Sequence, residues 1–249
     1  MRLSIHDNKT ALGNVAAREG ADVIRAAIEA NGGATIIVAT GASQFEMLNA
    51  LVREEIDWSK VVVFHLDEYV GVGIDHPASF RRYLEERLVQ HVSGPGEFVA
   101  IDGMAPDLDA ELNRLNRRIA GEAVDVCFAG IGENCHLAFN DPPADFDVDE
   151  PYIVVELDAA CRRQQMGEGW FETMDDVPAR AISMSIRQIM KARKLILSVP
   201  DARKAQAVSD AVEGMVTNAH PASIIQKHDD CSLHLDLAAA KKLSAERMR

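Results

Sequence analysis

Two patterns of hydrophobic residues alternate along the chain. Short, continuous apolar runs predict buried parallel strands, and they cover Ala34–Ala39, Val61–Leu66, Val124–Ala129 and Lys194–Val199. Between them, apolar residues recur at helical spacing, which predicts helices over Ala11–Asn31, Gln44–Glu54, Ala78–Val92, Ala105–Ala120 and Ala202–Val212. Two glycines follow Asn31, which is typical of a helix end.

Weaker patterns predict the remaining elements. Phe98–Ile101 and Ser232–Leu237 favour strands, Tyr152–Leu157 alternates as in an edge or antiparallel strand, Ser223–Lys227 favours a short segment, and the charged tail Ala238–Arg249 favours a helix. Repeated β–α units with buried strands imply a mostly parallel sheet with helices on both faces. We therefore expect an α/β fold with a single doubly wound, Rossmann-like sheet, and one domain over residues 1–249.

The fold class indicates where a ligand would bind. In doubly wound sheets ligands bind beyond the carboxyl ends of the strands, near the point where the strand order reverses. This rule selects four loop segments, which are Thr40–Gln44, His65–Gly73, Gly130–Asp141 and Pro200–Lys204.

The charge balance narrows the class of partner. The chain of 249 residues has 39 acidic and 26 basic side chains, a formal net charge of −13. This argues against nucleic acid and anionic membranes as partners. It allows a phosphorylated small molecule, because backbone N–H groups and one or two cations can bind a phosphate. Since no apolar run approaches the roughly 20 residues of a membrane helix, we expect a cytoplasmic protein.

The four cysteines, Cys127, Cys135, Cys161 and Cys231, form neither a CxxC pair nor a zinc-ligand spacing. We interpret them as reduced thiols of a cytosolic protein. The sequence therefore predicts no metal site.

Two segments favour an anion. Gly41 allows the Thr40–Ser43 loop to turn tightly before a helix, and the N–H groups at a helix start attract anions. A plain turn with Ser43 as N-cap is the alternative. Lys204 lies in the first turn of a later helix, where a cation is unfavourable unless an anion is near. Simple exposure is the alternative for this lysine.

Asp67 and Glu68 are adjacent carboxylates at the end of a predicted strand. Neighbouring side chains of a strand point to opposite sides, so at least one should face the crevice. A partly desolvated carboxylate with a raised pKa can abstract a proton α to a carbonyl. The alternative is a solvated loop that caps the next helix.

His136 follows two glycines that end a strand, with Asn134 and Asp141 nearby. Imidazole is an acid and base near neutral pH, and a carboxylate can select its tautomer. A structural histidine is the alternative. Farther on, the polar cluster Arg162-Arg163-Gln164-Gln165 is also explained by a solvated helix face.

Taken together, these segments resemble the glucosamine-6-phosphate deaminase family. Residues 62–71 (VVFHLDEYVG) and 75–80 (DHPASF) resemble its DEYVG…HPxSY/F signature, and residues 130–142 (GIGENCHLAFNDP) resemble GIGxxGHIAFNEP. The resemblance extends from about Ala34 to His234. It implies an enzyme that isomerises and deaminates glucosamine 6-phosphate to fructose 6-phosphate and ammonia. Because such chemistry only moves protons, no metal or organic cofactor is expected.

The resemblance also implies roles. The loop Thr40, Gly41, Ala42, Ser43 should bind the phosphate together with Lys204. The family's proton-transferring carboxylate corresponds to Asp67, and its ring-opening acid and base to His136. Asn134 and Asp141 match the two positions that support the histidine.

Several positions depart from the family pattern. Ala42 replaces a common serine, Asn134 stands where some members have Asp, Cys135 replaces a glycine, and Asp141 is shorter than the usual Glu. The family's phosphate-binding arginine is missing before Trp170-Phe171, which leaves Arg162 or Arg163 as substitutes. These departures leave the identity of the substrate open.

Three alternatives follow. The substrate could be another amino-sugar phosphate, such as galactosamine 6-phosphate. A 6-phosphogluconolactonase would share the fold, although its expected GxGxDGHxASLFP differs from HLAFNDP at 136–142. Non-enzymatic sugar-phosphate sensors usually carry an N-terminal helix-turn-helix, and the roughly 30 residues before the first strand are too few for one beside the first helix. The sequence leaves the oligomeric state open, a homo-oligomer included.

Overall fold

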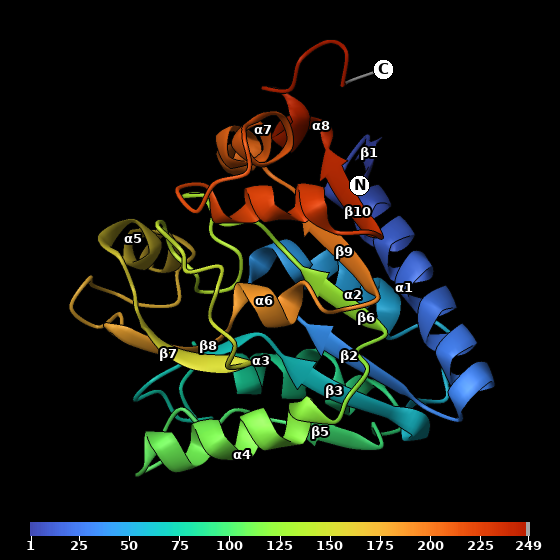
Figure 1. Ribbon diagram of the computed structural model, residues 1–249, viewed down its shortest axis with the longest axis vertical. Helices are drawn as coiled ribbons and strands as arrows, with labels where there is room; N and C mark the ends of the chain where they lie inside the picture. Colours follow the sequence, from blue (N-terminus) through green and yellow to red (C-terminus); the bar gives the residue numbers. More distant parts are fainter. Residues whose placement is uncertain (248–249) are drawn as a thin grey trace.

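The computed structural model describes residues 1–247 and is built on one parallel sheet (Figure 1). Seven strands pair in the order β1-β10-β9-β6-β2-β3-β5. Their bounds are β1 Arg2–His6, β2 Ala34–Val38, β3 Val61–His65, β5 Glu97–Val99, β6 Val126–Ala129, β9 Lys194–Val199 and β10 Cys231–Asp236. The expected α/β sheet is confirmed, and the predicted bounds of β9 are those observed.

Helices cover both faces of this sheet. One face packs against α1 (Lys9–Asn31), α2 (Phe45–Leu51) and α3 (Phe80–Arg87), and the other against α4 (Leu108–Ala120), α6 (Ile186–Ile189) and α7 (Ala205–Glu213). Alternate residues of a buried strand therefore enter different cores. In β2, Ile36 and Val38 belong to the α1 side, and Ile37 belongs to the α4 side.

The ends of α1 illustrate how local sequence sets the elements. The Asn8 side chain accepts a hydrogen bond of 2.9 Å from the N–H of Ala11, as an N-cap does. Gly32 ends the helix with φ 80, a left-handed conformation that glycine adopts without steric cost. The predicted helix end is thus confirmed.

A second, smaller sheet lies beyond the carboxyl ends of the parallel strands (Figure 1). It consists of β4 (Asp67–Tyr69), β8 (Arg180–Met184) and β7 (Tyr152–Glu156), antiparallel in the order β4-β8-β7, with α5 (Ala159–Gly167) nearby. The edge position of β7 confirms that prediction. The expectation of a single sheet was wrong, because the chain leaves the main sheet after His65 and pairs Asp67 with Ser183 instead.

Other differences lie at the termini and at element ends. Strand β1 was not predicted, since Arg2–His6 is mostly half-buried and polar. The helix expected over Ala238–Arg249 is wrong, because α8 spans only Leu237–Ala240 and the described part of the tail continues as turns. Residues 248–249 lie outside the described part. The short segment near Ser223–Lys227 is the 3₁₀ helix η5, Pro221–Lys227.

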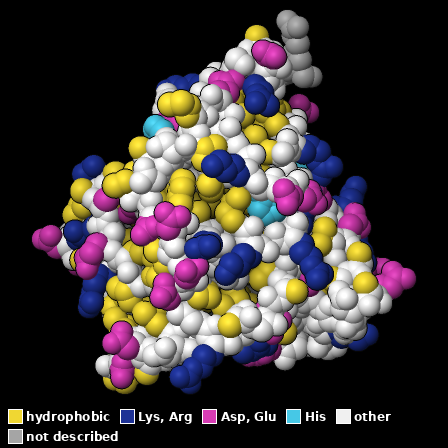
Figure 2. Space-filling model, viewed as in Figure 1, with side chains coloured by type: hydrophobic (Ala, Val, Ile, Leu, Met, Phe, Trp, Pro, Cys, Tyr) yellow, Lys and Arg dark blue, Asp and Glu magenta, His cyan; other side chains and the backbone are white. Residues whose placement is uncertain are grey.

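The surface mixes charges of both signs. On the face in Figure 2, Lys and Arg side chains are scattered among acidic and apolar ones. None of the helices in residues 1–247 combines the length and apolar character that spanning a bilayer requires. All four cysteines are buried free thiols.

Candidate active site

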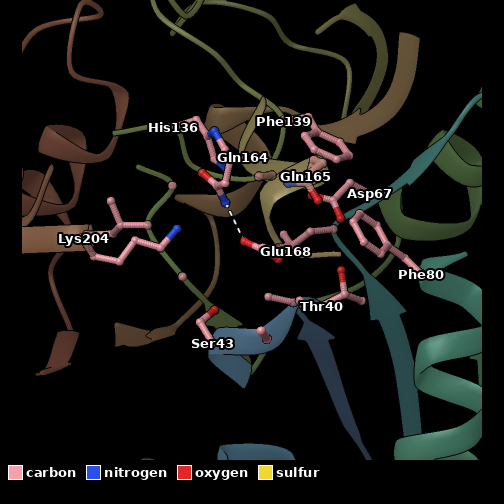
Figure 3. A pocket seen from close by; sticks show the side chains of 18 residues that line it. Thr40, Ser43, Asp67, Phe80, His136, Phe139, Gln164, Gln165, Glu168 and Lys204 are labelled. Carbon is pink, nitrogen blue, oxygen red and sulfur yellow. Dashed lines mark hydrogen bonds between the residues drawn. The ribbon is translucent and has the colours of Figure 1, made fainter. Parts of the chain in front are cut away.

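The four loop segments selected from the sequence lie around one pocket, at the carboxyl ends of β2, β3, β6 and β9 (Figure 3). Helix α5 and the residue after it complete the wall. The lining residues used below are Thr40, Gly41, Ala42, Ser43, Asp67, Phe80, Gly132, His136, Phe139, Gln164, Gln165, Glu168 and Lys204.

The Thr40–Ser43 loop presents backbone donors to this pocket. Gly41 has φ 91, a conformation that favours glycine. The N–H groups of Gly41, Ala42 and Ser43 donate to no acceptor within residues 1–247. The hydroxyl of Tyr83 donates to the Gly41 carbonyl at 2.9 Å, which anchors the turn. An anion can therefore accept consecutive backbone hydrogen bonds here.

Gln44 anchors the other end of the loop. Its side chain is fully buried, and its amide donates to the Ser43 hydroxyl at 3.0 Å and to the Ser198 carbonyl at 3.2 Å. The loop is thereby tied to β9, the strand that precedes Lys204.

Lys204 supplies a cation on the same side of the pocket. Its side chain is only 6% exposed, and in the described chain no carboxylate oxygen lies within 4.0 Å of its Nζ. Burial lowers the pKa of Lys204, and the charge of Glu168 opposes that shift. A buried ammonium without a partner is costly, so the site favours an incoming anion.

Asp67 begins β4 and points into the pocket (Figure 3). It is 7% exposed. Burial, together with the neighbouring charge of Glu68, raises the pKa of Asp67 to about 8. A carboxylate with this pKa is a much stronger base than an exposed one, which suits proton abstraction near neutral pH.

Glu68 points away from the pocket, as strand alternation requires. Its carboxylate accepts hydrogen bonds from the Ser79 hydroxyl at 2.8 Å, the Phe80 N–H at 3.1 Å and the Arg81 N–H at 2.8 Å. These donors belong to the start of α3. Both interpretations of this carboxylate pair therefore apply, each to one residue. Asp67 faces the crevice, and Glu68 caps the start of α3.

His136 is held by Asp141 and Asn134. Its Nδ1 lies 3.1 Å from Oδ1 of Asp141, and the Asn134 amide donates to the same oxygen at 2.9 Å. Burial would raise the pKa of Asp141, but the hydrogen bond and charge of His136 and the Asn134 amide hold it below its usual value. An ionised carboxylate only accepts hydrogen bonds, so Nδ1 carries the proton and Nε2 is the basic nitrogen.

The ligand atoms of His136, Asp141 and Cys161 lie within 4.8 Å of one another, a spacing that could hold a metal. Their contacts favour a hydrogen-bonded triad instead. Asp141 already accepts from Asn134 and from the N–H of Asp158. Burial raises the pKa of the Cys161 thiol far above neutral, which disfavours the thiolate that a metal binds.

The two candidate arginines do not line the pocket. Arg162 donates to the Val177 carbonyl at 2.8 Å, and Arg163 is exposed. Their neighbours Gln164 and Gln165 line it instead, with Glu168 one turn later. This polar cluster stands out in the sequence. Which of its side chains face the pocket is decided by their position around the helix and not by their charge.

Comparison with known proteins shows which family the chain belongs to. The family described as glucosamine-6-phosphate isomerases/6-phosphogluconolactonase matches residues 7–233. A glucosamine-6-phosphate deaminase of Lacticaseibacillus paracasei is 36% identical over 98% of this chain and 99% of its own. The chain belongs to the glucosamine-6-phosphate deaminase family. A deaminase of Streptococcus suis is 37% identical over 89% of this chain and 92% of its own.

Comparison with solved structures gives the same family. A monomeric glucosamine-6-phosphate deaminase has a TM-score of 0.89 at 29% identity, covering 97% of this chain and all (100%) of that one. A 6-phosphogluconolactonase of Shewanella baltica has a TM-score of 0.80 at 20% identity, covering 95% and 97%. The second likeness concerns the fold alone. The family resemblance read from the sequence is therefore confirmed.

Proposed function

We propose that this deaminase-family protein converts glucosamine 6-phosphate and water into fructose 6-phosphate and ammonia. One observation carries the proposal: the buried carboxyl of Asp67 faces the same pocket as the His136–Asp141 pair and the phosphate-type loop with Lys204. The curated relatives that match nearly the full chain carry this activity in their names.

The substrate would bind with its phosphate at the Thr40–Ser43 loop and its sugar toward His136 and Asp67. The phosphate accepts hydrogen bonds from the N–H groups of Gly41, Ala42 and Ser43 and pairs with Lys204. Because the phosphate is remote from the reacting carbons, its binding energy positions the sugar. His136 then transfers the proton that opens the ring, with Nε2 as the reactive atom and Asp141 stabilising the imidazolium.

Asp67 carries out the isomerisation. It takes the C2 proton of the open aldose while the carbonyl oxygen O1 gains a proton, which gives an enolamine. It then returns a proton at C1 while the amino nitrogen loses one, which gives the ketimine. Water adds to the ketimine carbon, and the resulting carbinolamine loses ammonia to leave the ketose. General acid and base help of this kind contributes roughly 10²–10⁴ in rate for each group.

Another amino-sugar phosphate, such as galactosamine 6-phosphate, would need the same groups and differ only in the pocket's fit to C4. Lactone hydrolysis is disfavoured by the sequence HLAFNDP at 136–142 and by the deaminase names of the curated relatives.

Ammonia release from glucosamine 6-phosphate tests the proposal, with galactosamine 6-phosphate and 6-phosphogluconolactone run in parallel. We expect ammonia from the glucosamine compound, and a loss of at least about 10³-fold in Asp67→Asn. Asp75→Asn, at an exposed position before α3, is the control and should retain wild-type turnover. Acid release from the lactone without ammonia from either amino sugar would overturn the proposal.

A further inference from the structure

The proposed reaction leaves one pocket carboxylate without a role. Glu168 directly follows α5, and its carboxylate lies in the middle of the pocket, between Lys204 and Asp67 (Figure 3). Its Oε1 accepts a hydrogen bond from the Gln164 amide at 3.0 Å, and its Oε2 lies 3.4 Å from the Trp170 indole nitrogen, which donates to it. These contacts hold it in the pocket rather than in solvent.

The carboxylate lies on the phosphate side of the pocket. A Cβ added to Gly41 would lie 3.8 Å from Glu168 Oε2, so this oxygen is just above the phosphate-type loop. Lys204 lines the same pocket without a carboxylate partner within 4.0 Å among the described residues. By contrast, the buried Lys194 contacts Glu19 at 2.9 Å and also pairs with Asp230. Glu168 is therefore the pocket anion that faces an otherwise unpaired buried lysine.

A phosphate monoester brings up to two negative charges to this end of the pocket. Two anions that share one partly desolvated site repel each other strongly. Gly167 and Gly169 flank Glu168, and a Cβ at either would meet nothing within 4 Å, so there is open space on both sides of this residue. Turning the Glu168 side chain away from the loop would break its hydrogen bonds to Gln164 and Trp170.

We propose that Glu168 is the internal counter-ion of Lys204 in the empty pocket and competes with the substrate's phosphate, so that it sets the affinity for sugar phosphates. The inference rests on the proposed function in one respect, which is that the Thr40–Ser43 loop and Lys204 form the phosphate end. Wild-type affinity is then a balance between the incoming dianion and the resident carboxylate.

Direct binding measured by calorimetry tests this without any turnover. The probes are inorganic phosphate and fructose 6-phosphate, and the variant is Glu168→Gln, which keeps an oxygen to accept from Gln164 or Trp170. We expect both probes to bind the variant about tenfold more tightly than wild type, because one repelling charge is gone. The matched control is Glu172→Gln, an exposed carboxylate in the same segment, which should change affinity less than twofold.

Trp170 fluorescence supplies a second readout. Phosphate should change the emission of the wild-type protein, because displaced Glu168 no longer accepts from the indole, and Trp170→Phe should abolish that change. Equal or weaker phosphate binding by Glu168→Gln would overturn the inference, because the carboxylate would then not oppose the incoming anion. Ammonia release by the wild type, measured separately, distinguishes this failure from a failure of the proposed function.

Discussion

The Asn134 amide donates a hydrogen bond of 2.9 Å to Oδ1 of Asp141, the same oxygen that lies 3.1 Å from Nδ1 of His136. Asn134 also accepts from the backbone N–H of His136 at 3.2 Å. One amide therefore orients both the carboxylate and the histidine. Some members of the family have Asp at the first of these positions, and the usual residue at the second is the longer Glu. Asn134 and Asp141, which both differ from those residues, interact directly here, because the asparagine amide donates to the shorter aspartate.

Asn134→Asp should therefore lower turnover of glucosamine 6-phosphate about tenfold at neutral pH. The change places two carboxylates in contact, and like charges at this distance repel or share a proton. The measurement is kcat, compared with Asn113→Asp on the exposed side of α4 as the control. Unchanged turnover in Asn134→Asp would mean that the amide donor is not what supports Asp141.

Asp67 should make stability depend on pH. Its pKa rises from 3.8 to about 8 on folding, so between these values the folded state binds a proton that the unfolded state has lost. Stability from this group is thus lost as pH rises from about 4 to about 8. Asp67→Asn removes the cost and should raise Tm by several degrees at pH 8, with little change at pH 4. Thermal melts at both pH values measure this, and an equal shift at both would contradict it.

The pH dependence of wild-type activity should reflect the ionisation of Asp67. If Asp67 is the base we propose, only its ionised form accepts the C2 proton, so kcat/KM should rise with pH toward about 8. The substrate's own titration is common to all variants, so comparing profiles isolates the enzyme. Glu68→Gln, which removes the neighbouring charge, should move the acidic limb to lower pH. A limb that stays in place while the rate falls throughout would indicate a purely structural role for Glu68.

Lys204 should lower the stability of the empty protein and strengthen its binding of phosphate. Burial lowers its pKa, so at neutral pH its charge costs stability in the empty protein. Lys204→Met should raise Tm by a few degrees and weaken phosphate binding about 100-fold. Lys194→Met is the matched control, since Lys194 is similarly buried but paired with Glu19. That variant should lower Tm, and a lower Tm in Lys204→Met as well would show that the charge of Glu168 outweighs the cost of burying the Lys204 ammonium.

Much of the main sheet was predictable because its strands are buried on both faces and read as continuous apolar runs. The small sheet was not, because β4 has three residues, two of them carboxylates, and forms only by pairing with distant β8. Long-range pairing leaves little local trace. The pocket loops were predictable from the rule for strand ends, whereas Gln164 and Glu168 depended on the phase of α5.

Gly132 should be needed for the position of the His136 ring. A Cβ at Gly132 would lie 2.3 Å from ring atoms of His136, including Nε2, so the ring must move aside. Because a misplacement of about 1 Å in a reacting group can cost about 10²-fold in rate, Gly132→Ala should lower kcat by about that factor. Gly121→Ala is the control, because its Cβ would meet nothing within 4 Å. Phosphate affinity, measured in both variants, should remain unchanged, since Lys204 and the Thr40–Ser43 loop are untouched. If Gly132→Ala retained kcat, the ring of His136 would not be the acid and base that opens the sugar.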